Sequence, residues 1–140
     1  MPVIEQTVVI QKPLFDVFRV ATDFAQWHTW QNGVKNVALI SGDPIRAGTM
    51  VSLERGSTFI NADVTDYQRQ KTLSLTGIWG RFRFARVIEF SATGRETTIR
   101  DKLTVQTGFL WFWYNPILSA NLSRQIKSDW VNLKKQLESS

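Results

Sequence analysis

The stretch FRFARVIEFSATGRETTIRDKLTVQT, residues 82–107, decides the fold of this chain. Apolar side chains recur at every second position on both sides of Thr93-Gly94, a pair with the residue chemistry of a tight turn. A period of two places alternate residues on one face of a strand. The stretch therefore predicts an antiparallel hairpin with two long strands, Phe82–Phe90 and Thr97–Thr107.

The turn also predicts how the two strands pair. A turn centred on Thr93-Gly94 places Arg86 opposite Asp101. A shift by one residue would set Arg86 against Arg100 or Lys102, which like charges disfavour. The same turn pairs the other inward residues, namely Phe90 with Thr97, Ile88 with Ile99, Phe84 with Leu103 and Phe82 with Val105. The Arg–Asp pair is either a structural ion pair that fixes the register, or a polar anchor for a ligand carboxylate, phenol or carbonyl.

Upstream of this hairpin the same period of two continues. Short turn-forming segments rich in Gly, Pro, Asp and Ser separate the strands, and short connections imply antiparallel neighbours. The predicted strands are Val3–Gln11, Val34–Ser41, Gly48–Arg55, Thr58–Tyr67 and Thr72–Trp79.

Helical patterns occupy the two remaining parts of the chain. Pro13 suits the first position of a short helix, and Asp23 with Gln26 resembles a capping box that opens a second one, through Trp30. Near the other end, Asn115-Pro116 predicts the start of an amphipathic helix of roughly 22 residues, on the order of 33 Å long. Its apolar stripe is Leu118, Leu122, Ile126, Trp130, Leu133 and Leu137. The expected α+β fold is thus a curved antiparallel sheet of about seven strands wrapped around a long C-terminal helix.

The composition is typical of one globular domain over residues 1–140. Six Trp and nine Phe are many for this length, and such side chains fill a core or line a pocket. With no Cys and one His, neither a metal site nor any cofactor is expected. The net charge of +5 is scattered, which makes nucleic acid an unlikely partner. No signal-peptide pattern and no membrane span is visible, so we expect a cytoplasmic protein.

Several motifs resemble the SRPBCC superfamily of START-like, birch-pollen-allergen-like helix-grip domains, and within it the polyketide cyclase/dehydrase and lipid-transport group. They are Lys12-Pro13 with Val17 and Phe18, the segment Asp23–Trp30, Gly48-Thr49 and the ending Trp130–Glu138. The resemblance covers nearly the whole chain. It implies the helix-grip fold and a cavity between sheet and C-terminal helix that holds a small hydrophobic or amphipathic molecule. It carries over no catalytic residue, because the superfamily shares no catalytic motif.

Candidate ligand contacts follow from the expected inward faces and the aromatic residues. They are Arg86, Asp101, Phe84, Ile88, Leu103, Trp27, Trp30, Trp79, Trp111, Trp113 and Leu122. Trp27 and Trp30 stand three apart and can touch the same surface, as core residues or as cavity lining. The aromatic cluster 109–114 cannot face one core as a whole, so part of it is expected to form a ligand gate or a peripheral membrane contact.

No residue pattern in the sequence indicates catalysis. His28, the single histidine, lacks a neighbouring carboxylate to orient it as a general base. No phosphate-binding glycine loop, nucleophile elbow or zinc-protease motif occurs.

Three functions remain open from the sequence. The first is binding or transport of a small hydrophobic ligand such as a lipid or polyketide. The second is a cyclase/dehydrase-type enzyme in which Asp101 or Arg86 provides an acid–base group. The third is an interaction domain that docks on a partner or membrane through the aromatic cluster or the outward basic face. That face comprises Arg81, Arg83, Arg100 and Lys102. The oligomeric state is not predicted.

Overall fold

A computed structural model describes residues 3–40, 45–106 and 111–139, without the side chains of residues 111–119. Within these described ranges, seven strands and three helical segments follow one another. They are β1 (Val3–Ile10), α1 (Leu14–Ala21), the 3-10 helix η1 (Phe24–Thr29), β2 (Val34–Leu39), β3 (Met50–Arg55), β4 (Thr58–Gln68), β5 (Thr72–Trp79), β6 (Phe82–Thr93), β7 (Glu96–Gln106) and α2 (Trp111–Glu138). The predicted order of elements is confirmed.

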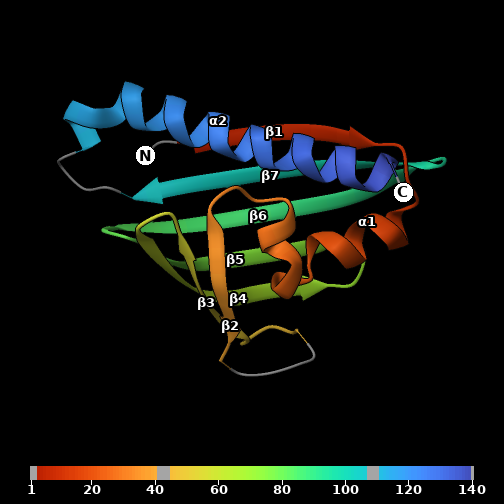
Figure 1. Cartoon of the computed structure of the whole chain (residues 1–140), viewed down its shortest axis with the longest axis horizontal. Coiled ribbons are helices and arrows are strands. Elements are labelled where there is room, and N and C mark those ends of the chain that lie inside the picture. The colour runs from red at the N-terminus through yellow and green to blue at the C-terminus, as the bar shows by residue number, and fades with distance from the viewer. Residues whose placement is uncertain (1–2, 41–44, 107–110, 140) are drawn as a thin grey trace.

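The strands form one antiparallel sheet in the order β1-β7-β6-β5-β4-β3-β2. In Figure 1, α2 runs alongside β1, and its C-terminal end reaches the segment between β1 and α1, where Glu138 accepts a hydrogen bond from Gln11 N. The two short helical segments connect β1 to β2, which are the opposite edges of the sheet.

The sheet curves around α2, as two contacts demonstrate. Asp101 of β7 accepts a hydrogen bond from Trp130 of α2. Arg55 of β3 pairs with Asp129, the preceding residue of α2. Three strands lie between β7 and β3, and four strand spacings would separate the two by about 19 Å in a flat sheet. Strong curvature brings both strands to one turn of the helix. The expected α+β helix-grip fold is therefore confirmed.

The core lies between the concave face of the sheet and the apolar stripe of α2. Alternate residues of the central strands are buried, as the period of two predicts. The helix contributes Leu122, Ile126, Trp130, Leu133 and Leu137 to this core. None of the helices in the described part of the chain is long and apolar enough to cross a membrane.

The predicted register of the long hairpin is wrong by two residues. The chain turns at Gly94-Arg95, so that Thr93 pairs with Glu96, and Asp101 stands opposite Ile88 rather than Arg86. Gly94 has a φ of +63°, which suits the first position of a two-residue hairpin turn. Because side chains alternate between the two faces of a strand, a shift by two residues leaves every inward residue on its predicted face.

The starts of the three helical segments also differ in detail from prediction. Helix α2 begins at Trp111, before the expected cap at Asn115-Pro116, because the aromatic residues upstream contain no glycine or proline that would end a helix. At η1, the Asp23 carboxylate accepts from Ala25 N at 3.2 Å, an N-cap without the reciprocal Gln26 bond of a capping box. The first helical position predicted for Pro13 is wrong by one residue, since Pro13 is the N-cap and α1 begins at Leu14.

Gly77 marks a close approach of β4 to β5. A Cβ atom at this position would lie 2.0 Å from the carbonyl oxygen of Asn61 and 2.7 Å from Cα of Ala62. Both atoms belong to the backbone of β4 and cannot move aside as a side chain does. We expect Gly77→Ala to lower the free energy of unfolding by up to about 3 kcal/mol, measured by urea denaturation. Gly94→Asn, at an open turn, should change it by less than ~1 kcal/mol, and equal losses in both variants would contradict the close approach.

Candidate functional site

Arg86 and Asp101 form a bidentate ion pair inside the core. The Nε atom of Arg86 lies 2.9 Å from Oδ1 of Asp101, and Nη2 lies 2.5 Å from Oδ2. Arg86 is 6% exposed and Asp101 is 2% exposed. The two residues are diagonal neighbours across β6 and β7, a separation that a long arginine side chain spans. The predicted pairing of these two residues is thus present, although not between directly opposite positions.

Asp101 is further fixed by the helix, since Trp130 Nε1 donates to its Oδ2 at 2.8 Å. Burial by itself would lower the pKa of Arg86. The charge and hydrogen bonds of Asp101, with a smaller attraction from Asp129, outweigh this effect and raise the pKa of Arg86. The guanidinium therefore carries a full positive charge within the apolar core.

A second ion pair, which the sequence did not lead us to expect, lies beside the first. Arg55 Nη1 contacts Asp129 Oδ2 at 2.8 Å and Nη2 contacts Oδ1 at 3.0 Å. The side chains are 9% and 1% exposed. Asp129 falls between Ile126 and Leu133 on the apolar stripe of α2, and a carboxylate at such a position is the sequence signal of a buried pair.

Tryptophans pack around these charges. The Trp30 and Trp130 ring centroids are 5.0 Å apart, and those of Trp27 and Trp30 are 6.1 Å apart. Trp27 Nε1 donates to the carbonyl of Ala21 at 2.9 Å, whereas Trp30 Nε1 has no partner among the described residues. Trp27 and Trp30 are buried, as expected for core residues.

A small internal void of about 30 Å³ lies beside the charges. The polar residues that line it are Gln31, Arg55 and Arg86, and its apolar walls include Trp27, Trp79 and Phe84. Gln31 is 4% exposed, and its Nε2 has no hydrogen-bond partner among the described residues. A void of this size holds about one water molecule, so it is too small for an organic ligand as it stands.

A larger cleft of about 410 Å³ opens where the β5–β6 turn faces α2. Its apolar walls are Trp79, Phe82, Phe84, Val105 and Leu122. Its polar rim includes Asn121 and Gln125 of α2 together with Arg81 and Thr58. Trp79 and Phe84 line both the cleft and the inner void, and their rings meet edge to face with centroids 6.1 Å apart. The two spaces are therefore separated by these two side chains.

The predicted ligand contacts thus fall into five groups. Trp79, Phe84 and Leu122 line the cleft, and Trp27 and Arg86 line the inner void. Asp101 lies behind Arg86, held by it and by Trp130. Ile88, Leu103 and Trp30 are buried in the core. The side chains of Trp111 and Trp113 lie outside the described residues, as does the gate expected at 109–114.

Acidic side chains stand among the basic residues of the outward face. Arg100 stands between Glu89 and Thr7, and Lys102 has Glu5 as a cross-strand neighbour. Within the part of the chain that the structure describes, no group of three or more His, Cys, Asp or Glu side chains gathers to hold a metal ion.

Two carboxyl groups of α2 should titrate in opposite directions. Burial raises the pKa of Asp129, against the opposing hydrogen bonds and charge of Arg55 and the weaker influence of Arg86. The Gln11 N–H and then the Lys134 ammonium lower the pKa of Glu138, which accepts from both at 2.8 Å. A carbon-detected NMR titration should therefore place the Asp129 midpoint above about 3.9 and the Glu138 midpoint below about 4.3, the ordinary values.

The stability consequences have opposite signs. Asp129 favours the folded state fully at pH values below its unfolded pKa, and this contribution is lost as pH rises through its raised folded pKa. Glu138 contributes stability above its unfolded pKa, and the contribution is lost as pH falls through its lowered folded pKa. An Asp129 midpoint below that of a free aspartate would contradict the buried setting of this pair.

Solved structures of other proteins share this fold over nearly the whole chain. TTHA0849 from Thermus thermophilus is 14% identical, with a TM-score of 0.81 over 99% of this chain and 98% of that chain. A START superfamily protein from Mycobacterium smegmatis is 13% identical, with a TM-score of 0.79 over 98% and 97%. Ara h 8.0201 is 11% identical, with a TM-score of 0.77 over 99% of each chain. At such low identity the likeness concerns the fold alone.

The sequence itself carries the family relationship. No curated protein matches it significantly. The family model described as polyketide cyclase / dehydrase and lipid transport matches residues 1–138, a range that includes the segment Asp23–Trp30. The chain is therefore a member of the polyketide cyclase/dehydrase and lipid transport family, within the SRPBCC superfamily.

Proposed function

We propose that this protein binds a small hydrophobic or amphipathic molecule in the cleft between the β5–β6 turn and α2. The observation that carries the proposal is the cleft itself. Its volume of about 410 Å³ lies within the ~300–1,000 Å³ range of small-molecule sites. Five apolar side chains form its walls, while its polar groups lie at the rim, an arrangement that suits an apolar ligand body.

The hydrogen-bond donors that line the inner void favour a ligand with a polar end. Gln31 Nε2 and the guanidinium groups of Arg55 and Arg86 are hydrogen-bond donors, and Gln31 Nε2 lacks an acceptor among the described residues. A ligand oxygen, as in a carbonyl or carboxylate, is the group that accepts from such donors. Reaching them requires that Trp79 and Phe84, which stand between cleft and void, turn aside. The apolar body would then stay in the cleft while the ligand oxygen occupies the void.

The proposal is tested with N-phenyl-1-naphthylamine, an uncharged apolar dye whose fluorescence rises on leaving water. Wild-type protein should bind it saturably. Asn121→Trp fills the cleft from an exposed position of α2, and we expect it to weaken dye binding about ten-fold, a loss of ~1.4 kcal/mol of contact energy.

Arg124→Trp is the matched control for this experiment. Arg124 is exposed on the same helix but does not line the cleft. The control variant should bind the dye with wild-type affinity, because an added tryptophan outside the cleft removes no ligand contact. Equal weakening in both variants, or no saturable binding by wild type, would contradict the proposed site.

An enzyme of the cyclase/dehydrase kind is the second candidate, because the family description includes these activities. The contacts of Asp101 argue against it as the proton-transfer group. Both its oxygens accept hydrogen bonds, from Arg86 and Trp130, and it does not line the inner void. A carboxylate so engaged is a poor general base. Conversion of a bound polyketide by wild type and its loss in Asp101→Asn, with binding retained, would favour the enzyme.

A further inference from the structure

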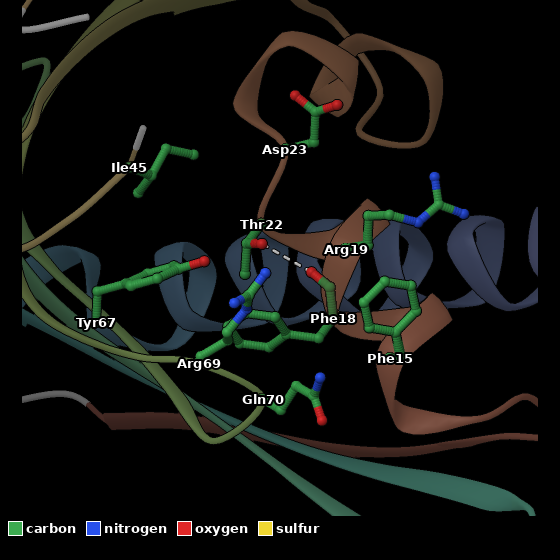
Figure 2. A pocket seen from close by; sticks show the side chains of 9 residues that line it. All are labelled: Phe15, Phe18, Arg19, Thr22, Asp23, Ile45, Tyr67, Arg69 and Gln70. Atoms are coloured by element: carbon green, nitrogen blue, oxygen red, sulfur yellow. Dashed lines mark hydrogen bonds between the residues drawn. The ribbon is translucent and has the colours of Figure 1, made fainter. Parts of the chain in front are cut away.

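A separate hollow lies between α1, the turn that joins β4 to β5, and the chain before β3 (Figure 2). Its volume is about 390 Å³, and it shares no lining residue with the cleft beside α2. The residues that matter for its chemistry are Phe15, Phe18, Tyr67, Arg69 and Gln70. Its size falls within the range of small-molecule sites.

The apolar surface of this hollow is aromatic. Phe18 is only 4% exposed, and its ring lies 5.7 Å from that of Tyr67 and 5.0 Å from that of Phe90, centroid to centroid. These contacts fix the Phe18 ring as a rigid floor. Phe15, one helical turn earlier on α1, is 55% exposed at the side of the hollow. A flat apolar ligand would cover aromatic surface that is now in water.

Two hydrogen-bond donors, the Arg69 guanidinium and the Tyr67 hydroxyl, line the hollow beside this aromatic floor. Figure 2 shows the guanidinium of Arg69 in front of Phe18, with the Tyr67 hydroxyl directed toward the same space. Neither group has a hydrogen-bond or ion-pair partner among the described residues. Among the described residues that line the hollow, Asp23 is the one carboxylate, and it already caps η1 through Ala25 N. The available polar groups therefore favour an anion.

The turn that carries Arg69 is held in place. Lys71 N donates to the carbonyl of Gln68 at 2.9 Å, and Phe90 N donates to the carbonyl of Lys71 at 2.7 Å. Gln70 has a φ of +59°, a left-handed conformation that is uncommon for a residue other than glycine or asparagine. Such strain is tolerated where the surroundings hold the backbone, and it concentrates at ligand-binding turns. Arg69 is thus presented from a fixed turn rather than a free loop.

We propose that this hollow is a second binding site, for a small organic carboxylate with a flat apolar body. Arg69 pairs with the carboxylate, in the bidentate geometry that guanidinium favours, and the Tyr67 hydroxyl donates to it. The apolar body packs against Phe18 and Phe15. Because the hollow and the cleft share no residue, this site does not depend on the function proposed for the cleft.

The probe is 2-naphthoate, and its binding is followed by the amide chemical shifts of isotope-labelled protein. We expect saturable shifts at Phe18, Thr22 and Gln70. Arg69→Gln should weaken 2-naphthoate binding about ten-fold or more, because it removes a charge-assisted contact. The uncharged 2-naphthamide should bind wild type and Arg69→Gln within about two-fold of each other. Phe15→Ala should weaken both compounds.

Two controls test whether 2-naphthoate binds in this hollow rather than elsewhere on the protein. Arg100→Gln removes an exposed arginine from the outer sheet face and should leave 2-naphthoate binding unchanged. Asn121→Trp, which blocks the cleft, should also leave it unchanged. The inference is overturned if 2-naphthoate causes no saturable shifts at these amides, if Arg69→Gln binds it as well as wild type, or if Asn121→Trp abolishes its binding.

Discussion

Replacing Asp101 by asparagine should lower the free energy of unfolding by about 3–5 kcal/mol. The change leaves the guanidinium of Arg86, 6% exposed, without its charge partner inside the core. It also weakens the acceptor of the Trp130 indole N–H. Urea denaturation followed by circular dichroism measures the loss, and Glu89→Gln, an exposed acid of the same hairpin, should change stability by less than ~0.5 kcal/mol.

The double variant Arg86→Met/Asp101→Asn tests whether the loss arises from the unpaired charge. Removing both charges leaves an apolar side chain of similar length and an amide oxygen that can still accept from Trp130. We expect the double variant to be more stable than Asp101→Asn alone. If the losses of the two single changes simply add, the two side chains are not coupled and the buried pair is contradicted.

Leu133→Ala should lower the free energy of unfolding by about 2–5 kcal/mol. Leu133 is fully buried on the face of α2 that packs against the sheet, and its truncation leaves a cavity at the centre of that contact. The same urea experiment measures it. Val131→Ala is the matched control, since Val131 is 36% exposed on the same helix and alanine is the better helix former. A loss of similar size at both positions would show that α2 does not pack as described.

The sequence predicts the faces of the strands better than their register. Residues of the hairpin keep their predicted inward or outward side, because the period of two is a local property of the chain. The register depends on which residues form the turn. Two turn centres, Thr93-Gly94 and Gly94-Arg95, would keep every side chain on the same face of the sheet. The strand pattern therefore cannot choose between them, and the structure shows the turn at Gly94-Arg95.

The charged network shows where prediction from sequence ends. Arg86 and Asp101 lie on adjacent strands joined by a short turn, so periodicity brings them together. Arg55 and Asp129 meet only because the sheet curves around α2 and because α2 is rotated about its axis so that Asp129 faces β3. The curvature depends on the packing of the whole core, which no short stretch of sequence specifies.

The space available to a ligand could not be predicted from the sequence either. An inward face rich in Phe and Trp predicts either a filled core or a lined cavity, and the pattern cannot distinguish the two. In the structure Trp27, Trp30 and Trp130 pack against one another, which leaves about 30 Å³ beside the charges. Trp79 and Phe84, by contrast, reach the open cleft. Ligand contact with Trp79 and Phe84 therefore stays a prediction to be tested.

Ligand binding in the cleft is best tested by a methyl NMR titration with N-phenyl-1-naphthylamine, on protein labelled at Ile, Leu and Val methyl groups. We expect saturable shifts at Leu122 and Val105, which line the cleft, and none at Ile78, which is 48% exposed on the opposite face of the sheet. Shifts of equal size at Ile78, or none at Leu122 and Val105 when the dye is bound, would contradict a ligand site in this cleft.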